Sequence, residues 1–158
     1  MKTDQKIKKI LEILKKRNWS IGIMESCTGG TMANAVTNIP GASDVFKCGL
    51  VTYSDEAKIK AGVDEKIIKK FGVYSIETAE EMARKIAGSV GVGITGNMND
   101  PAEVFVAVRV EEKIWSEKIL VESHACRQAG KNKNEIKARK EKKMKVVEKV
   151  IGMISDNL

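Results

Sequence analysis

Residues 25–30 read Glu-Ser-Cys-Thr-Gly-Gly and place two possible nucleophiles, Ser26 and Cys27, side by side. At a turn from strand to helix, a hydroxyl or thiol can attack a carbonyl carbon, and N–H groups of the turn can stabilise an oxyanion or bind phosphate. Small polar residues and glycine are also typical of an ordinary helix start. These six residues alone do not separate a nucleophile from a helix cap.

A serine nucleophile needs a base, and lysine is the candidate that the sequence offers. The only histidine, His124, follows the last predicted strand, and nothing in the sequence places it near Ser26. Lys58 falls one turn into a short helix predicted after the second strand, so its stem can reach back to the strand end. To act as a base, its pKa must fall well below about 10.4. Tyr53, at the same strand end, can relay a proton or hold the lysine.

Two other interpretations stay open. In the first, Cys27 is the nucleophile, because a thiol at a helix N-terminus can ionise without a lysine. In the second, the residues are structural: Ser26 caps a helix and Cys27 is a small buried thiol. Tyr53 is then a strand aromatic and Lys58 a surface charge.

The elements that must position these residues follow from hydrophobic periodicity. Helices are predicted at 4–17, 32–39, 54–60, around 67–71, from Ser75 to a stop at Gly88, and over a long C-terminal stretch whose apolar face is Ile136, Met144, Val147, Val150, Ile151 and Ile154. Strands are predicted within 19–26, 45–53, 90–96, 103–110 and 113–122. The last two are joined by a tight turn near Glu111 and Glu112, which predicts an antiparallel pair.

Helix and strand alternate before two strands run consecutively, so we predict one α/β domain over residues 1–158. Its architecture is a three-layer α/β/α arrangement with a mixed sheet of about five strands. In such sheets ligands bind beyond the carboxyl ends of strands. Three loops are predicted there: 25–30, 52–58 and 95–100.

The net charge and its distribution indicate which partners to expect. The 158 residues carry a net charge of +7, but glutamates interleave with the lysines of the basic run around 137–145 and no aromatic lies within that run. This pattern is typical of a solvated helix face, so we expect no specific nucleic-acid binding.

No apolar run approaches the roughly 18 residues of a membrane span, and the first residues do not resemble a secretory signal. We expect a cytoplasmic protein with its three cysteines reduced.

Four motifs occur in order: ESCTGG at 25–30, PGAS at 40–43, GLVTYSDEAK at 49–58 and GITG at 93–96. Together they resemble the C-terminal domain of the competence-damage-inducible CinA proteins, a family that also occurs as stand-alone nicotinamide-nucleotide amidohydrolases. The resemblance implies hydrolysis of nicotinamide mononucleotide to nicotinate mononucleotide and ammonia, with neither metal nor cofactor.

The same resemblance implies roles for individual residues. Ser26 becomes the nucleophile, Lys58 its base and Tyr53 a supporting group. Glu25 would orient the turn and Thr28 would contact the nucleotide. The full set expected to bind substrate is Glu25, Cys27, Thr28, Gly29, Gly30, Thr95, Gly96, Lys133 and Lys137. The expected partners are this small nucleotide and further copies of the chain in a homo-oligomer.

Two departures from the family pattern keep alternatives open. After Thr95-Gly96 the family continues with a Gly-Pro-containing loop, whereas this chain has 97–100 in the order Asn, Met, Asn, Asp. Near the end, a G-x-R-x-x-x-R pattern is replaced by Gly130, Lys133 and Lys137 with an apparent one-residue insertion, and lysine lacks the bidentate fork of arginine. A nucleotide-binding homologue that hydrolyses poorly is the second hypothesis. A basic nucleic-acid-associated protein is the third.

Overall fold

The computed structural model describes residues 2–99, 101–122 and 131–158, with the side chains of 131–134 outside the description. The elements along the chain are α1 (Thr3–Lys16), β1 (Ile21–Glu25), α2 (Thr31–Thr37), the 3-10 turn η1 (Ala42–Asp44), β2 (Phe46–Val51), α3 (Asp55–Lys60), α4 (Glu65–Phe71), α5 (Ile76–Lys85), β3 (Val90–Asn97), β4 (Ala102–Val110), β5 (Lys113–Val121) and α6 (Lys131–Asn157). Most predicted elements are therefore present close to their expected bounds.

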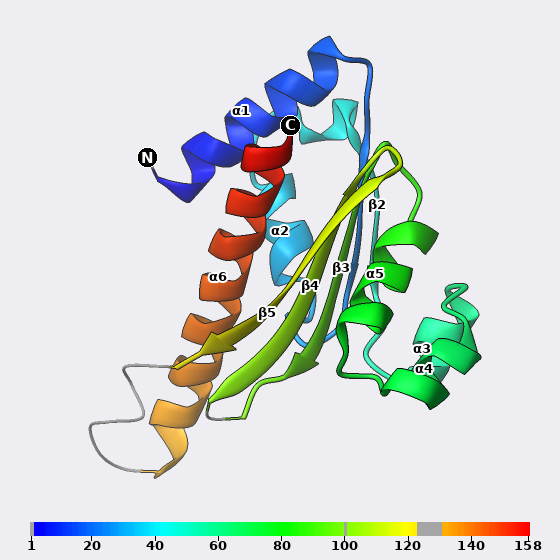
Figure 1. Ribbon diagram of the computed structural model, residues 1–158. Coiled ribbons are helices and arrows are strands. Elements are labelled where there is room, and N and C mark those ends of the chain that lie inside the picture. The colour runs from blue at the N-terminus through cyan, green and yellow to red at the C-terminus, as the bar shows by residue number, and fades with distance from the viewer. Residues whose placement is uncertain (1, 100, 123–130) are drawn as a thin grey trace.

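The strands form one five-stranded sheet in the order β2-β1-β3-β4-β5. β1 pairs in parallel with β2 and β3, whereas β4 pairs antiparallel with β3 and β5, so the predicted mixed sheet is confirmed. Helices α1, α2 and α6 lie on one face of the sheet, and α5 lies on the other with α3 and α4 beside it (Figure 1). This is the predicted α/β/α layering. The main core fills the space between the sheet and the first of these helical layers.

Helix α5 packs unusually close to β3, because β3 presents glycine where the helix crosses it. A Cβ built on Gly91 would lie 2.1 Å from the carbonyl oxygen of Ala83, and one on Gly93 would lie 2.0 Å from that of Ala79. The Gly-Val-Gly spacing of β3 thus places both glycines on the face that α5 covers.

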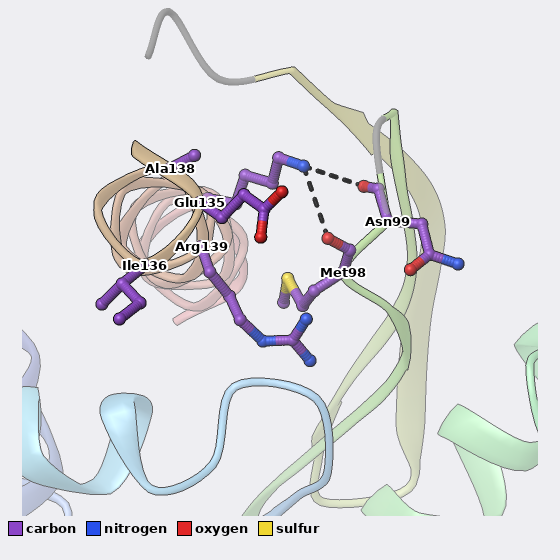
Figure 2. A pocket seen from close by; sticks show the side chains of 7 residues that line it. Met98, Asn99, Glu135, Ile136, Ala138 and Arg139 are labelled. Atoms are coloured by element: carbon purple, nitrogen blue, oxygen red, sulfur yellow. Dashed lines mark hydrogen bonds between the residues drawn. The ribbon is translucent and has the colours of Figure 1, made fainter. Parts of the chain in front are cut away.

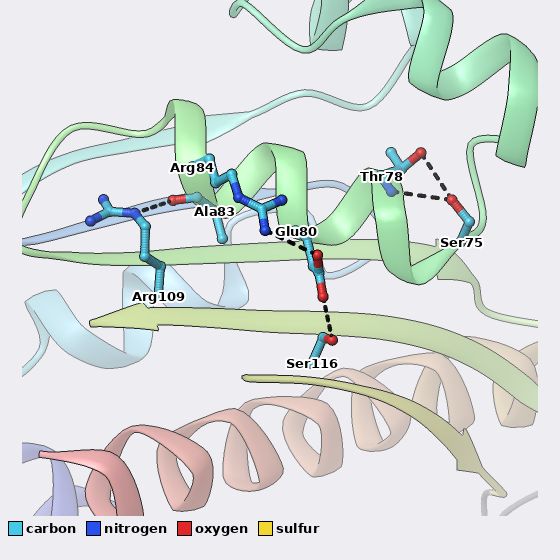
Figure 3. Close-up of polar contacts among 7 residues, drawn as sticks. All are labelled: Ser75, Thr78, Glu80, Ala83, Arg84, Arg109 and Ser116. Carbon is cyan, nitrogen blue, oxygen red and sulfur yellow. Dashed lines mark hydrogen bonds and ion pairs between the residues drawn. The ribbon is translucent and has the colours of Figure 1, made fainter. Parts of the chain in front are cut away.

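Polar contacts fix α5 at both ends and along its length (Figure 3). At its start, Ser75 Oγ accepts a hydrogen bond from the Thr78 N–H at 3.2 Å, as expected of a helix cap. At its end, Arg109 Nε donates to the carbonyl of Ala83 at 3.0 Å. The helix ends at Lys85, earlier than the predicted stop, and Gly88 lies in the connection to β3.

The apolar face predicted for α6 is wrong at two positions: Ile136 is 63% exposed and Met144 is also exposed. The buried face begins instead with Ala138, Lys142 and Val146. Each exposed residue lies two positions before a buried one, and two positions turn about 200° around a helix. No helix in the described part of the chain has both the length and the hydropathy required to cross a bilayer.

Candidate active site

The carboxyl ends of β1, β2 and β3 meet at one edge of the sheet, where Glu25 pairs with Val51 on one side and Ile94 on the other. The three loops predicted to lie together therefore do so. Between them is a hollow of about 200 Å³. It is lined by Ser26, Cys27, Tyr53, Asp55, Lys58, Val73, Tyr74, Gly96, Asn97, Met98, Asn99 and Arg139.

Ser26 and Lys58 form the closest pair of functional groups in this hollow. Lys58 Nζ lies 3.1 Å from Ser26 Oγ and 2.9 Å from the carbonyl oxygen of Thr52. Lys58 is 1% exposed and Ser26 5% exposed, so the interpretation of Lys58 as a surface charge is wrong. Ser26 is also no helix cap, because α2 begins at Thr31 with Gly30 as its N-cap residue.

Burial changes the acid–base chemistry of this lysine. Removal from water lowers the pKa of Lys58 below its usual 10.5, and the negative charge of Asp55 opposes the shift. A lysine with a lowered pKa has a larger neutral fraction near neutral pH. The neutral amine, already within hydrogen-bond distance, can accept the proton of the Ser26 hydroxyl.

Cys27 lies beside Ser26, but its environment suppresses the thiolate. Burial raises the pKa of the Cys27 thiol to about 12, and the charge of Glu25 acts in the same direction. Near neutral pH the group is therefore a protonated, buried thiol. This favours the packing interpretation of Cys27 over the nucleophile interpretation.

Glu25 organises the turn that follows β1. Its carboxylate is fully buried and accepts hydrogen bonds from the Thr28 hydroxyl at 2.5 Å, the Met32 N–H at 3.2 Å and the Ala33 N–H at 3.0 Å. The carboxylate thus ties the turn to the first turn of α2. The Thr28 side chain is fully buried and points to Glu25, so its hydroxyl serves the turn and does not line the hollow.

The glycines of this turn have backbone conformations that other residues rarely adopt. Gly29 has a φ of 59° and Gly30 a φ of 91°. The Gly29 N–H donates to the Ser26 carbonyl at 2.9 Å, which closes the turn directly behind the serine. This backbone hydrogen bond fixes Ser26 at the start of a tight turn.

The remaining predicted residues divide between the hollow and its surroundings. Tyr53 stands at the rim, 62% exposed, and its hydroxyl accepts a hydrogen bond from Arg139 at 3.3 Å. Thr95 is buried behind the hollow and donates to the Val73 carbonyl at 2.9 Å, while Gly96 lines the hollow. Lys137 is exposed and lines neither this hollow nor its neighbour. The Lys133 side chain and His124 lie outside the described residues.

A second, larger hollow of about 490 Å³ adjoins the first, between α6 and the loop after β3 (Figure 2). Lys142, buried within the apolar face of α6, donates to the carbonyls of Met98 and Asn99 at 3.3 and 2.9 Å and so holds the loop after β3.

The sequence interpretation missed Arg139 and Lys142. The available signal was that Lys142 falls between Ala138 and Val146 at helical spacing. In the described part of the chain, no cluster of His, Cys, Asp and Glu has the arrangement to hold a metal ion.

Comparison with known proteins agrees with this architecture. The CinA C-terminal domain family model matches residues 3–133. A CinA-like protein of Chloroherpeton thalassium is 51% identical over 90 residues, which cover 54% of this chain and 21% of the relative. A protein of Caldanaerobacter subterraneus subsp. tengcongensis, named as competence-damage inducible, is 36% identical over 131 residues, covering 75% of this chain and 32% of the relative. The chain thus spans a third or less of the length of these two relatives.

Solved structures of this superfamily share the fold across almost the whole chain. A CinA superfamily protein from Klebsiella pneumoniae has a TM-score of 0.80 at 20% identity, covering 99% of this chain and 97% of that one. The competence/damage inducible protein CihA of Agrobacterium tumefaciens has a TM-score of 0.79 at 24% identity, covering 96% and 93%. At such identities the likeness shows the fold alone, but the family model adds agreement in sequence over the loops that build the hollow. The chain belongs to the CinA C-terminal domain family.

Proposed function

We propose that this chain hydrolyses the carboxamide of nicotinamide mononucleotide, with Ser26 as nucleophile and Lys58 as base. The observation that carries the proposal is the 3.1 Å contact between Lys58 Nζ and Ser26 Oγ, both buried at the sheet edge where α/β folds bind ligands. The lowered pKa of Lys58 supports it, since a base must be neutral to accept a proton. The choice of substrate rests on the family resemblance.

The reaction would proceed through an acyl-enzyme. Ser26 Oγ bonds to the carboxamide carbon while its proton passes to the Lys58 amine. The C–N bond then breaks, and the departing nitrogen takes that proton and leaves as ammonia. Water attacks the resulting ester, releases nicotinate mononucleotide and returns a proton to Ser26. We assign oxyanion stabilisation to N–H groups of the 27–30 turn other than that of Gly29, which donates to Ser26.

Ammonia release from nicotinamide mononucleotide by the purified protein tests this proposal. Ser26→Ala should lower kcat by several orders of magnitude, as losing one member of a nucleophile–base unit typically does. Cys27→Ala serves as the matched neighbour and should keep a substantial fraction of activity, because its thiol stays protonated. Full activity in Ser26→Ala would exclude the mechanism.

A second candidate is a nucleotide-binding protein with little turnover. The observation that favours it is that Asn97, Met98 and Asn99 line the hollow where the family pattern has a Gly-Pro-containing loop. Calorimetry separates the two functions. Binding of the mononucleotide without ammonia release would support the binding protein.

A further inference from the structure

The Thr52 side chain is buried beside the Ser26–Lys58 pair, and its hydroxyl is unpaired. Thr52 is 4% exposed, and in the described part of the chain its Oγ1 is the one buried side-chain oxygen or nitrogen without a hydrogen-bond partner. A buried hydroxyl without a partner destabilises the folded state, and native proteins pair the large majority of such groups. An unpaired hydroxyl next to a nucleophile and its base therefore points to a role in the chemistry.

The strand register places the Thr52 side chain beside that of Ser26. Glu25 of β1 pairs with Val51 of β2, and the Thr52 N–H donates to the Glu25 carbonyl at 2.9 Å. The parallel ladder thus continues one residue beyond both strands, where Thr52 lies next to Ser26. The Glu25 carboxylate binds N–H groups of α2, so the side chains of Ser26 and Thr52 point to the opposite face of the sheet. Lys58 of α3 contacts Ser26 on that face.

The Lys58 amine has different hydrogen-bonding needs before and after it takes the serine proton. The neutral amine has one lone pair and two N–H donors, whereas the ammonium has three donors and no lone pair. Among the described residues, Nζ contacts Ser26 Oγ and the Thr52 carbonyl, which leaves one N–H without an acceptor in either form. In the ammonium this N–H belongs to a buried charge, for which a missing hydrogen bond costs far more free energy.

We propose that the Thr52 hydroxyl accepts this remaining N–H when Lys58 is protonated, and so stabilises the ammonium that forms as Ser26 attacks. The hydroxyl oxygen has two acceptor lone pairs, and rotation about the Cα–Cβ bond moves it between staggered positions. Thr52 does not line the hollow, so it is a positioning residue that acts through Lys58. The inference rests on the proposed function, which makes Lys58 the base.

The test compares Thr52→Val, which replaces the hydroxyl with a methyl group, with Thr52→Ser, which keeps the hydroxyl. Thr52→Val should lower kcat for nicotinamide mononucleotide about tenfold to a hundredfold, as expected for a hydrogen bond to a charged group, and change KM less than about twofold. Thr52→Ser should keep most of the wild-type kcat.

Thr78→Val is the matched control, because it makes the same change at a buried hydroxyl that is paired and lies outside the hollow. The Thr78 hydroxyl donates to the Gly72 carbonyl at 2.8 Å. The midpoint of urea denaturation should therefore fall in Thr78→Val, with kcat unchanged. In Thr52→Val the midpoint should stay or rise, because the deleted hydroxyl had no partner.

The pKa of Lys58 is a readout that a purely structural role of Thr52 would not change. Losing an acceptor disfavours the charged amine, so the pKa of Lys58 should fall in Thr52→Val and stay near the wild-type value in Thr52→Ser and Thr78→Val. An NMR titration of the lysine side chains, with the Lys58 signal assigned through Lys58→Arg, measures this without turnover. The variants leave in place the titratable and charged groups around the amine, which are Asp55, Cys27, Tyr53, Tyr74 and Arg139.

The outcomes separate this inference from the proposed function. If the wild type releases no ammonia, the amidase proposal fails, and the NMR titration alone decides the role of Thr52. An equal pKa of Lys58 in wild type and Thr52→Val overturns the inference whether or not the mononucleotide is hydrolysed. A loss of kcat in Thr52→Ser as large as that in Thr52→Val also overturns it, since the shape of the side chain and not its hydroxyl would then matter.

Discussion

At the residue scale, the site depends on a lysine that is removed from water. Two opposing effects act on its acidity. Burial disfavours the charged form and lowers the pKa of Lys58, while the carboxylate of Asp55 favours the charged form and raises it. The Thr52 carbonyl holds the amine in place beside Ser26. The neutral fraction of Lys58 at a given pH therefore depends partly on the charge of Asp55, although Asp55 takes no direct part in the proton transfer from Ser26.

This balance predicts the direction of a pH shift. Removing the Asp55 charge removes the effect that raises the pKa of Lys58, so the pKa falls and the base becomes neutral at lower pH. In Asp55→Asn the rising limb of kcat/KM against pH should therefore move to lower pH. The measurement is the pH profile of amide hydrolysis in wild type and variant.

The neighbouring variant Glu56→Gln provides the control, because it makes the same charge change at the next exposed position of α3. Its profile should stay with that of the wild type. A rising limb that moves to higher pH in Asp55→Asn, or that moves equally in both variants, would show that Lys58 is not the titrating base.

At the element scale, the position of the sheet edge depends on how α5 lies on β3. Gly91 and Gly93 let the helix backbone approach the strand, and Arg109 binds the end of α5 while Ser116 of β5 donates to Glu80 at 2.7 Å. β3 also carries Thr95 and Gly96 to the site. The packing of α5 therefore contributes to the placement of the loop after β3.

Gly93→Ala should destabilise the fold by at least about 2 kcal/mol, because the new methyl group would meet backbone oxygen, which cannot move aside as a flexible side chain can. Urea denaturation followed by circular dichroism measures the effect. Gly152→Ala in α6 is the matched control: a Cβ there meets nothing within 4 Å, and alanine should stabilise the helix by up to about 1 kcal/mol. Equal stability of the two variants would contradict the close packing.

At the scale of the whole molecule, the net charge of +7 is spread among mixed-sign surfaces. On α6, Lys145 pairs with Glu141 at 3.3 Å and Lys149 pairs with Glu117 of β5 at 3.0 Å. Lys142 is turned inward to the loop after β3. The basic run thus includes one buried anchor, Lys142, and one paired surface charge, Lys145, and Lys149 beyond it is paired as well, which differs from a continuous nucleic-acid-binding stripe.

We expect nucleic-acid association to be weak and to disappear with salt, because the remaining attraction comes from counterion release and is independent of sequence. Fluorescence anisotropy with a labelled DNA duplex, titrated at low and at roughly physiological salt, measures this. A nanomolar complex that survives physiological salt and discriminates between sequences would instead support the nucleic-acid hypothesis.

The sequence by itself determined which elements exist and which loops follow the parallel strands. The spacing of apolar residues, every two in a strand and every 3.6 in a helix, is a local property, so β1, β3 and α5 could be predicted from their own residues. The order of the ESCTGG, YSDEAK and GITG motifs was sufficient to select Ser26 and Lys58 as candidates. The carboxyl ends of parallel strands share one edge, so the meeting of their loops followed from the topology.

Only the tertiary structure decided which face of α6 is buried and which cations reach the hollow at the sheet edge. In the sequence, Ile136 and Met144 fit an apolar stripe better than Ala138 and Lys142 do, because they are the more apolar pair and both pairs fall at helical spacing from the residues that follow. The choice depends on contacts with strands that are distant along the chain, where small Ala138 fits and Lys142 finds the carbonyls of Met98 and Asn99. Rotating the helix to satisfy those contacts brings Arg139 to the hollow and leaves Lys137 in solvent, a result that no local pattern contains.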